Sequence, residues 1–214
     1  MPIIDNKIYL ASKSPRRREL LRQVGIDFDL LLLRDTAPRG PDVTEIVLPG
    51  ELPMDYVKRV TQEKAQVAWS IMQQRKLAPR PVLAADTTVV IHDHILGKPA
   101  DQAEACDMLR ALSGQTHAVL TSLAVVGMHG HGHEHWQEHW HITQRSEVTF
   151  SELSEEQILA YCITAEPYDK AGGYGIQGAA ARFISHISGS YSGIMGLPLF
   201  ETATLLRQAG IHIP

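Results

Sequence analysis

The chain has 214 residues, of which 44% are hydrophobic and 21% are charged, so its length and apolar content allow one sizeable core. The formal net charge of −4 argues against a nucleic-acid-binding protein that relies on a global positive field. No run of about 18 apolar residues is present, which excludes a membrane-spanning helix. The sequence shows no secretory signal, and Cys106 and Cys162 form no disulfide or metal pattern. We therefore expect a cytoplasmic protein.

The first half of the chain predicts strands that alternate with helices. In chain order we expect a strand at 7–11, a helix that Ser14 caps and Gly25 ends, a strand at 28–33, a loop at 35–53 and a helix from Met54 to about Arg75. We then expect a buried strand at 82–92, a short return at 95–98, and a helix that Asp101 and Glu104 begin and that ends near Gly114.

The second half predicts a long hairpin followed by shorter elements. We expect hairpin strands at 116–126 and about 140–150, a helix from the Ser154–Gln157 capping box to Ile163, a glycine-rich loop at 166–178, a strand at 182–187 and a last helix at 198–208. This order of elements predicts an α/β fold with a mixed sheet. No linker separates two domains, so we expect one domain over residues 1–214.

Charges near the N-terminus lie where helix stability disfavours them. Arg16, Arg17 and Arg18 fall in the first turn of the helix after Ser14, at the positive end of its dipole, where each cation costs about 0.3–1 kcal/mol. Free backbone N–H groups and arginine forks at such an end bind phosphate well. Solvated arginines that the helix merely tolerates are the alternative.

Two charged residues interrupt apolar patterns further along the chain. Lys64 lies in the middle of the stripe formed by Val60 and Val67 in the long helix, and it either extends to solvent or projects into a cleft that holds an anion. Asp86 lies in the strand at 82–92, where a carboxylate needs a partner such as Lys64, Lys98 or a bound cation. A buried structural ion pair is the alternative for Asp86.

Two further polar side chains lie among glycines and prolines. Lys98 occupies the tight Gly-Lys-Pro turn before a helix, and Gln177 lies between Ile176 and Gly178. Glycines allow a ligand to approach the backbone closely, and an amide can both donate to and accept from a base. A solvated lysine and a mobile polar loop are the alternatives.

Histidines gather between residues 129 and 141. His131, His133 and His135 alternate, as do His139 and His141, so they could share strand faces and bind a transition metal adventitiously. We prefer a solvated extension of the hairpin.

Several motifs are spread along the chain: Tyr9–Leu21 with its S-K-S-P-R-R run, Glu63-Lys64-Ala65, Ala85-Asp86-Thr87, Gly97-Lys98-Pro99, Leu112–His117, Asp169–Gly178 with its D-K-A-G-G-Y-G-I-Q-G run, and Gly189–Pro198. Together they resemble the Maf family of nucleoside triphosphate pyrophosphatases. They occur in the family's order and span nearly the whole chain. The S-x-S-P-R-R and D-K-A-G runs are specific, so a chance match to both is improbable.

The resemblance implies an elongated mixed β-sheet flanked by helices, with two lobes around a cleft. It also implies hydrolysis of a nucleoside triphosphate between its α and β phosphates, with a divalent cation such as Mg²⁺ or Mn²⁺. The Gly-Ile-Gln-Gly form is similar to the branch that prefers dTTP and UTP. Enzymes for 7-methyl-GTP or another non-standard nucleotide, and a non-catalytic nucleotide sensor that regulates cell division, are the alternatives.

The resemblance also implies site residues, each at a position that matches a family motif. It makes Asp86 the proton acceptor, and we predict that Lys64 and Lys98 take part in catalysis by neutralising phosphate charge. The positions of Ser12, Arg17, Lys64 and Lys98 match the phosphate site, and those of Arg16, Thr87 and Gln177 match residues tied to base choice. A nucleic-acid or membrane partner is not expected, and a homodimer is left open.

The chain departs from the family pattern at one acidic position after the second strand. Asp35 could take this role, or Glu45 or Glu51 could fold back to the site. The sequence does not choose among them, so the metal ligands stay unassigned.

Overall fold

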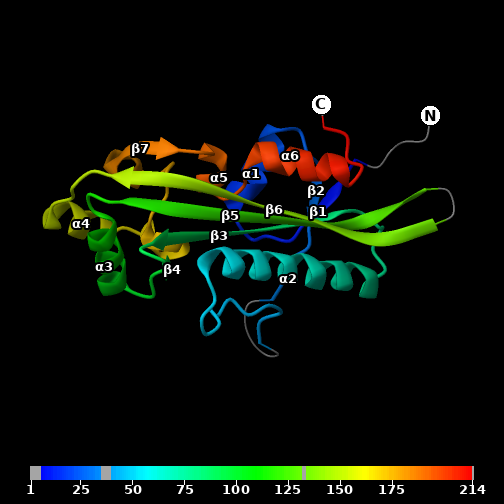
Figure 1. Ribbon diagram of the computed structural model, residues 1–214, viewed down its shortest axis with the longest axis horizontal. Helices are drawn as coiled ribbons and strands as arrows, with labels where there is room; N and C mark the ends of the chain where they lie inside the picture. The colour runs from blue at the N-terminus through cyan, green and yellow to red at the C-terminus, as the bar shows by residue number, and fades with distance from the viewer. Residues whose placement is uncertain (1–5, 35–39, 132–133, 214) are drawn as a thin grey trace.

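A computed structural model describes residues 6–34, 40–131 and 134–213, and it forms an elongated α/β structure around a mixed sheet of seven strands (Figure 1). The strands are β1 (Ile8–Leu10), β2 (Phe28–Leu30), β3 (Val82–Ile91), β4 (His94–Leu96), β5 (Thr116–His131), β6 (Glu134–Phe150) and β7 (Ile184–Ser188). Their order is β2-β1-β3-β5-β6-β7, with β4 paired to β3. β1 runs parallel to β2 and β3, and the other pairs are antiparallel. The predicted α/β class with an elongated mixed sheet is confirmed.

Helices cover both faces of the sheet (Figure 1). They are α1 (Pro15–Gln23), α2 (Pro53–Gln74), α3 (Gln102–Leu112), α4 (Glu155–Cys162), α5 (Tyr191–Met195) and α6 (Leu199–Gln208), with short 3₁₀ helices η1 (Pro167–Asp169), η2 (Ala171–Gly173) and η3 (Ala179–Phe183). α2 lies along one face, α1 and α6 lie on the other, and α3 and α4 lie together at one end. No described helix is long and apolar enough to cross a membrane.

Capping residues begin α1 and α4 where the sequence predicts. The Ser14 hydroxyl accepts a hydrogen bond from the Arg17 backbone N–H, and Pro15 takes the first position of α1, where its missing N–H is not needed. Ser154 and Gln157 form a complete capping box at α4.

Alternation along β3 decides which side each residue faces. Val82 and Ala84 pack in the apolar cluster that includes α2, whereas Leu83 and Ala85 pack in the cluster that includes α1 and α6. Successive strand residues point to opposite faces. The next two side chains, Asp86 and Thr87, therefore point toward α2 and toward α1 respectively.

Several predicted boundaries differ from the structure. β2 ends at Leu30 rather than at residue 33, and the predicted loop at 166–178 contains η1 and η2. The helix α5 was not predicted, because five residues are too few to show helical periodicity. It begins at the Ser190 cap and ends at Gly196, whose positive φ of 115° suits glycine.

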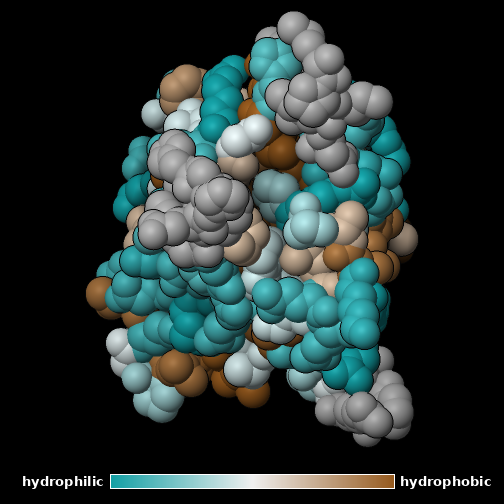
Figure 2. Space-filling model, turned by 90° about the vertical axis from the view of Figure 1, so that its right-hand side faces the viewer, coloured by the Kyte–Doolittle hydropathy of each residue, from teal (hydrophilic) through white to brown (hydrophobic). Residues whose placement is uncertain are grey.

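The hairpin of β5 and β6 extends beyond its predicted length. Its backbone pairing continues to His131 and resumes at Glu134, so the predicted hairpin extension is confirmed for the backbone. The side chains of residues 129–136 lie outside the described part, and the histidine metal hypothesis falls mostly on them. Figure 2 shows that hydrophilic side chains cover most of this end of the molecule.

Candidate active site

The central strand β3 has an open edge in the middle of its length. β1 pairs with β3 as far as Leu83, and β4 pairs with it again from Val89. Among the described strands, none covers this edge between the two points. Side chains on both faces of β3 can therefore reach one opening, although Asp86 and Thr87 point in opposite directions.

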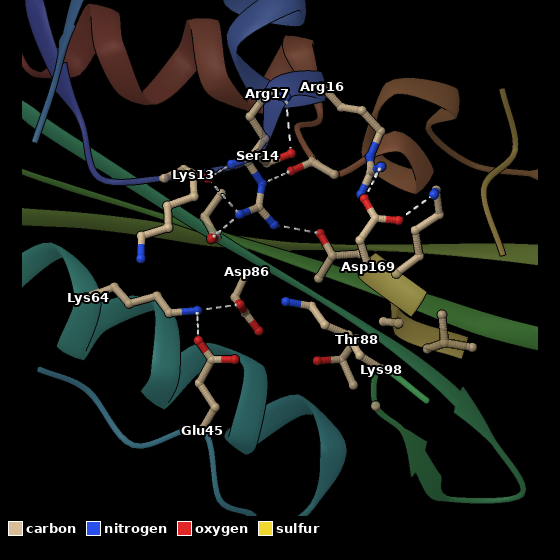
Figure 3. A pocket seen from close by; sticks show the side chains of 18 of the residues that line it. Lys13, Ser14, Arg16, Arg17, Glu45, Lys64, Asp86, Thr88, Lys98 and Asp169 are labelled. Carbon is tan, nitrogen blue, oxygen red and sulfur yellow. Dashed lines mark hydrogen bonds and ion pairs between the residues drawn. The ribbon is translucent and has the colours of Figure 1, made fainter. Parts of the chain in front are cut away.

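A cleft of about 900 Å³ lies at this open edge (Figure 3). Every side chain that the sequence analysis predicts for the site lines it: Ser12, Arg16, Arg17, Lys64, Asp86, Thr87, Lys98 and Gln177. These residues come from α1, α2, β3 and three connecting segments. The structure thus brings together all eight predicted positions from distant parts of the chain.

Asp86 forms an ion pair on the α2 side of β3. The Lys64 ammonium donates to Asp86 Oδ1 at 2.7 Å, and both side chains are only 14% exposed. The same Nζ atom lies 2.7 Å from Glu45 Oε1. Burial acts to lower the pKa of Lys64, but the two carboxylates outweigh it and the pKa is raised. Lys64 therefore stays charged and holds two carboxylates close together, rather than extending to solvent.

Two of the three acids proposed after the second strand, Glu45 and Glu51, are described by the structure, and of these two Glu45 reaches Lys64. Glu51 binds Arg59 on α2 instead. Asp35 lies outside the described residues. The loop after β2 thus carries one carboxylate back to the cleft.

Arg17 is held by protein atoms on the other side of β3. Its Nε donates to the Gly196 carbonyl at 2.7 Å, and its Nη1 donates to the Ala85 carbonyl at 2.7 Å. Nη1 also donates to Ser12 Oγ at 3.2 Å, and Nη2 donates to Thr87 Oγ1 at 3.1 Å. Burial lowers the pKa of Arg17, and nearby Asp86 opposes this effect. Four of its five N–H groups bind the protein, so Arg17 joins α1, β3 and the end of α5.

The hydroxyl of Thr87 belongs to a directed chain of hydrogen bonds. Thr121 donates its proton to the Gly193 carbonyl at 2.7 Å, so the 3.0 Å contact between the two threonine hydroxyls is a donation from Thr87 to Thr121. Thr87 also accepts from Arg17. It therefore offers a ligand only its remaining lone pair, as an acceptor.

Lys98 and Arg16, two further cations predicted for the site, differ in their contacts. Lys98 is exposed, and its ammonium points toward Asp86 and Thr88 (Figure 3). Arg16 forms a 3.3 Å ion pair with Asp169, which lies beside Lys170. Burial raises the pKa of Asp169, but Lys170 and Arg16 outweigh it, and the pKa is lowered. Asp169 was not predicted as a site residue, although it begins the D-K-A-G motif.

Gln177 is exposed at the cleft, and the loop that carries it is held from behind. Glu166 accepts hydrogen bonds from the Tyr161 hydroxyl at 3.1 Å and from the Ala179 N–H at 2.9 Å. A Cβ atom at Gly178 would lie 2.0 Å from Glu166 Oε1. Only glycine at this position lets the loop close over the Glu166 carboxylate.

A second anchor of the same loop lies in the core. Tyr174 lines the cleft, and its hydroxyl lies 2.7 Å from His117 Nε2 in a buried hydrogen bond. Burial lowers the pKa of His117 to about 4 and raises that of Tyr174. His117 lies on β5 and was not predicted as a site residue, although it ends the Leu112–His117 motif.

Comparisons with known proteins agree with this geometry. A family model described as "Maf-like protein" matches residues 7–209. A dTTP/UTP pyrophosphatase from Nitrosospira multiformis is 52% identical over 213 residues, which cover 100% of this chain and 99% of that protein. A dTTP/UTP pyrophosphatase from Dechloromonas aromatica is 50% identical over 206 residues, which cover 96% of this chain and 98% of that protein.

Proposed function

Because this chain belongs to the family of Maf-like proteins, we propose that it is a nucleoside triphosphate pyrophosphatase acting on dTTP and UTP. The observation that carries the proposal is the cleft at the open edge of β3. There, cationic side chains line the same opening as Asp86, a carboxylate on the central strand. A triphosphate needs such positive charge, and the added carboxylate suits hydrolysis rather than passive binding.

In the proposed reaction, water cleaves the anhydride between the α and β phosphates. The water oxygen bonds to the α-phosphorus, and the bond from this phosphorus to the bridging oxygen breaks. The proton of the water passes to Asp86, and pyrophosphate leaves. Lys64 orients Asp86 through their 2.7 Å hydrogen bond. Lys98, which is exposed and directed into the cleft, neutralises charge that develops on the leaving phosphates.

Arg17 has fewer N–H groups left for a phosphate than the sequence suggests. Four of its five N–H groups hold the wall of the cleft in place, which leaves one N–H group and the charge for a phosphate. Ser12 accepts from Arg17 and from the Ser14 N–H at 3.2 Å, so it fixes the turn before α1. We propose that both residues shape the phosphate site and contact the ligand at few points.

The carboxylates of the cleft fit a divalent cation held largely by phosphate oxygens. No cluster of three or more metal-ligating side chains occurs among the described residues. Asp86 and Glu45 share one ammonium, so they lie close enough to act together. Mg²⁺ is commonly held by one or two carboxylates together with substrate phosphates. Asp86 and Glu45 would hold the ion, which supplies charge neutralisation and lowers the pKa of a bound water.

We propose that Arg16, Thr87 and Gln177, which all line the cleft, recognise the base. Gln177 offers both an acceptor and a donor, whereas Thr87 offers only an acceptor. The uracil and thymine ring presents a carbonyl, an N–H and a second carbonyl in a row. An acceptor and an amide match that edge.

A nucleotide screen tests the proposal. Pyrophosphate release is measured for dTTP, UTP, CTP, 7-methyl-GTP and the purine triphosphates, with Mg²⁺, with Mn²⁺ and with EDTA. We expect turnover of dTTP and UTP that EDTA abolishes and Mg²⁺ or Mn²⁺ restores. Preferred turnover of 7-methyl-GTP would overturn the substrate assignment. Tight binding without pyrophosphate release would overturn the proposed enzyme activity and favour a nucleotide sensor.

Two further predictions of the sequence stay predictions, namely the cytoplasmic location and the single domain with two lobes. A homodimer stays open, as it is from the sequence. The absence of a nucleic-acid partner, which the net charge of −4 favours, also stays a prediction.

A further inference from the structure

Arg59 of α2 forms a two-point ion pair with Glu51. Its Nε donates to Glu51 Oε1 at 2.6 Å, and its Nη2 donates to Glu51 Oε2 at 2.9 Å. These hydrogen bonds lower the pKa of Glu51 to about 2. The Glu51 side chain is 9% exposed and that of Arg59 is 21% exposed. A planar guanidinium in this geometry fixes its partner in direction as well as in distance.

The same face of α2 holds the backbone beside Glu45. Arg59 Nη2 donates to the Ile46 carbonyl at 3.0 Å, and the Tyr56 hydroxyl donates to the Glu45 carbonyl at 3.0 Å. Tyr56 and Arg59 are three positions apart, so they project from one side of the helix. Two consecutive carbonyl groups of the loop are therefore tied to two neighbouring side chains of α2.

Glu51 closes this arrangement from the other end of the loop. Its Oε2 also accepts from the Leu48 N–H at 3.0 Å, and its own N–H donates to the Leu48 carbonyl at 3.0 Å. The loop from 43 to 51 is thus bonded to α2 at its middle and at its end. It is linked to the catalytic carboxylate through the contact of Glu45 with Lys64 described above.

Apolar burial holds this loop only at its start, where Val43 packs against the cluster that contains Tyr56 and Val60. It has no helix or strand, and its large apolar side chains Ile46, Val47 and Leu48 are exposed. A loop with exposed apolar side chains and no regular backbone bonds opens easily. Beyond Val43, the position of the loop therefore depends mainly on the polar contacts with Arg59 and Tyr56.

We propose that the Arg59–Glu51 pair is a positioning clamp that fixes the loop backbone and so holds the Glu45 carboxylate at Lys64. The inference rests on the function proposed above. Neither Arg59 nor Glu51 is among the described residues that line the cleft. The clamp therefore acts through Glu45 and does not touch the substrate.

The test begins with Arg59→Gln and a matched control, Arg110→Gln. Arg110 also binds a glutamate, Glu155, through two nitrogens and a neighbouring aspartate, Asp107, but it joins α3 to α4 away from the cleft. We expect Arg59→Gln to lower kcat by about 10- to 100-fold, as displacing a reacting group by about 1 Å does. We also expect a higher Mg²⁺ concentration for half-maximal rate. Arg110→Gln is expected to change kcat less than twofold.

A double-mutant cycle separates the clamp from a general loss of structure. If Arg59 acts through Glu45, then adding Arg59→Gln to Glu45→Gln lowers kcat less than twofold further. Multiplying effects would overturn the proposal, because they would show that Arg59 acts by another route. Glu51→Gln provides a second variant that leaves Arg59 in place, and it is expected to reproduce the kcat loss and the Mg²⁺ shift.

The results also distinguish the clamp from the function on which it rests. Full activity of Arg59→Gln and Glu51→Gln beside a slow Glu45→Gln would overturn the clamp and leave the pyrophosphatase standing. Wild-type kcat for Glu45→Gln would remove Glu45 from the reaction and overturn the clamp with it. No pyrophosphate release from any nucleotide by the wild-type protein would overturn the proposed function itself.

Discussion

The floor of the cleft and the loop that carries Gln177 are built in different ways. On the floor, formed by Asp86, Lys64 and Arg17, the side chains themselves have fixed partners: Asp86 is bound by Lys64, and Arg17 is bound by the carbonyls of Ala85 and Gly196. At the loop, Gln177 is exposed, and the backbone around it is fixed instead by Glu166 and by the His117–Tyr174 pair.

This difference predicts a division of labour. Side chains fixed by charge and hydrogen bonds keep the same geometry through a reaction, which suits bond cleavage. A free side chain on a fixed backbone can adjust to a base, which suits selection among nucleotides. We therefore expect changes on the floor to lower kcat and changes at the loop to raise KM.

The largest effect is expected from Asp86→Asn. The amide keeps the size of the side chain but cannot take a proton from water, so kcat should fall by at least about 100-fold, within the range typical of a lost general base. Nucleotide binding should persist, because the cations of the cleft are unchanged. Pyrophosphate release and calorimetric titration with a nucleotide measure the two effects.

Wild-type pyrophosphate release by Asp86→Asn would remove Asp86 from the mechanism. Loss of binding together with unchanged kcat would reverse the proposed roles of floor and loop. In this variant the Lys64 ammonium loses one of its two carboxylate partners. Circular dichroism checks that the variant keeps its secondary structure.

A pH-dependent effect on stability is expected from His117, which anchors the loop from the core. Its pKa is about 4 in the folded protein, against 6.5 for an unperturbed histidine, so the unfolded chain binds the proton more readily between these values. The stability due to neutral His117 is complete above pH 6.5 and is lost as the pH falls toward 4. The full loss is about 3 kcal/mol. Protonation is unfavourable because Nδ1 is buried and has no hydrogen-bond partner among the described residues.

Urea unfolding of wild type and His117→Gln at a series of pH values from about 7.5 to about 4 measures this effect. An amide does not titrate, so the stability of the variant should fall less steeply in this window than that of the wild type. Parallel curves for the two proteins would show that His117 is not the group that titrates. A matched titration of His186→Gln, an exposed histidine of β7, serves as the control.

The sequence predicted the floor of the cleft well because each of its residues broke a local rule. An aspartate in an apolar strand and a lysine in an apolar helix stripe both need partners, and the structure joins them at 2.7 Å. The arginines at the start of α1 shared this property, but Arg16 and Arg17 went to different partners. Spacing along a helix does not reveal which neighbouring arginine is turned into the core.

The anchors of the loop left no such signal. His117 and Tyr174 are 57 positions apart, and Glu166 looks like an ordinary surface acid. Glu45 reaches Lys64, whereas Glu51 binds Arg59. The sequence could not show this, because the path of an irregular loop decides which acid meets which cation. Local patterns identify residues that need a partner, whereas long-range packing decides which partner they meet.

The smallest of these effects is expected from Gly178→Ala at the loop. The added Cβ would lie 2.0 Å from Glu166 Oε1, so either the carboxylate or the turn must move, and the Ala179 N–H loses its acceptor. We expect KM for UTP to rise about 10-fold, which corresponds to about 1.4 kcal/mol, with kcat changed less than threefold. Steady-state kinetics with UTP and dTTP measure both constants. A fall in kcat at constant KM would show that this loop holds the reacting groups. The contrast between floor and loop would then be wrong, because one added methyl group in the loop would have slowed bond cleavage rather than weakened binding.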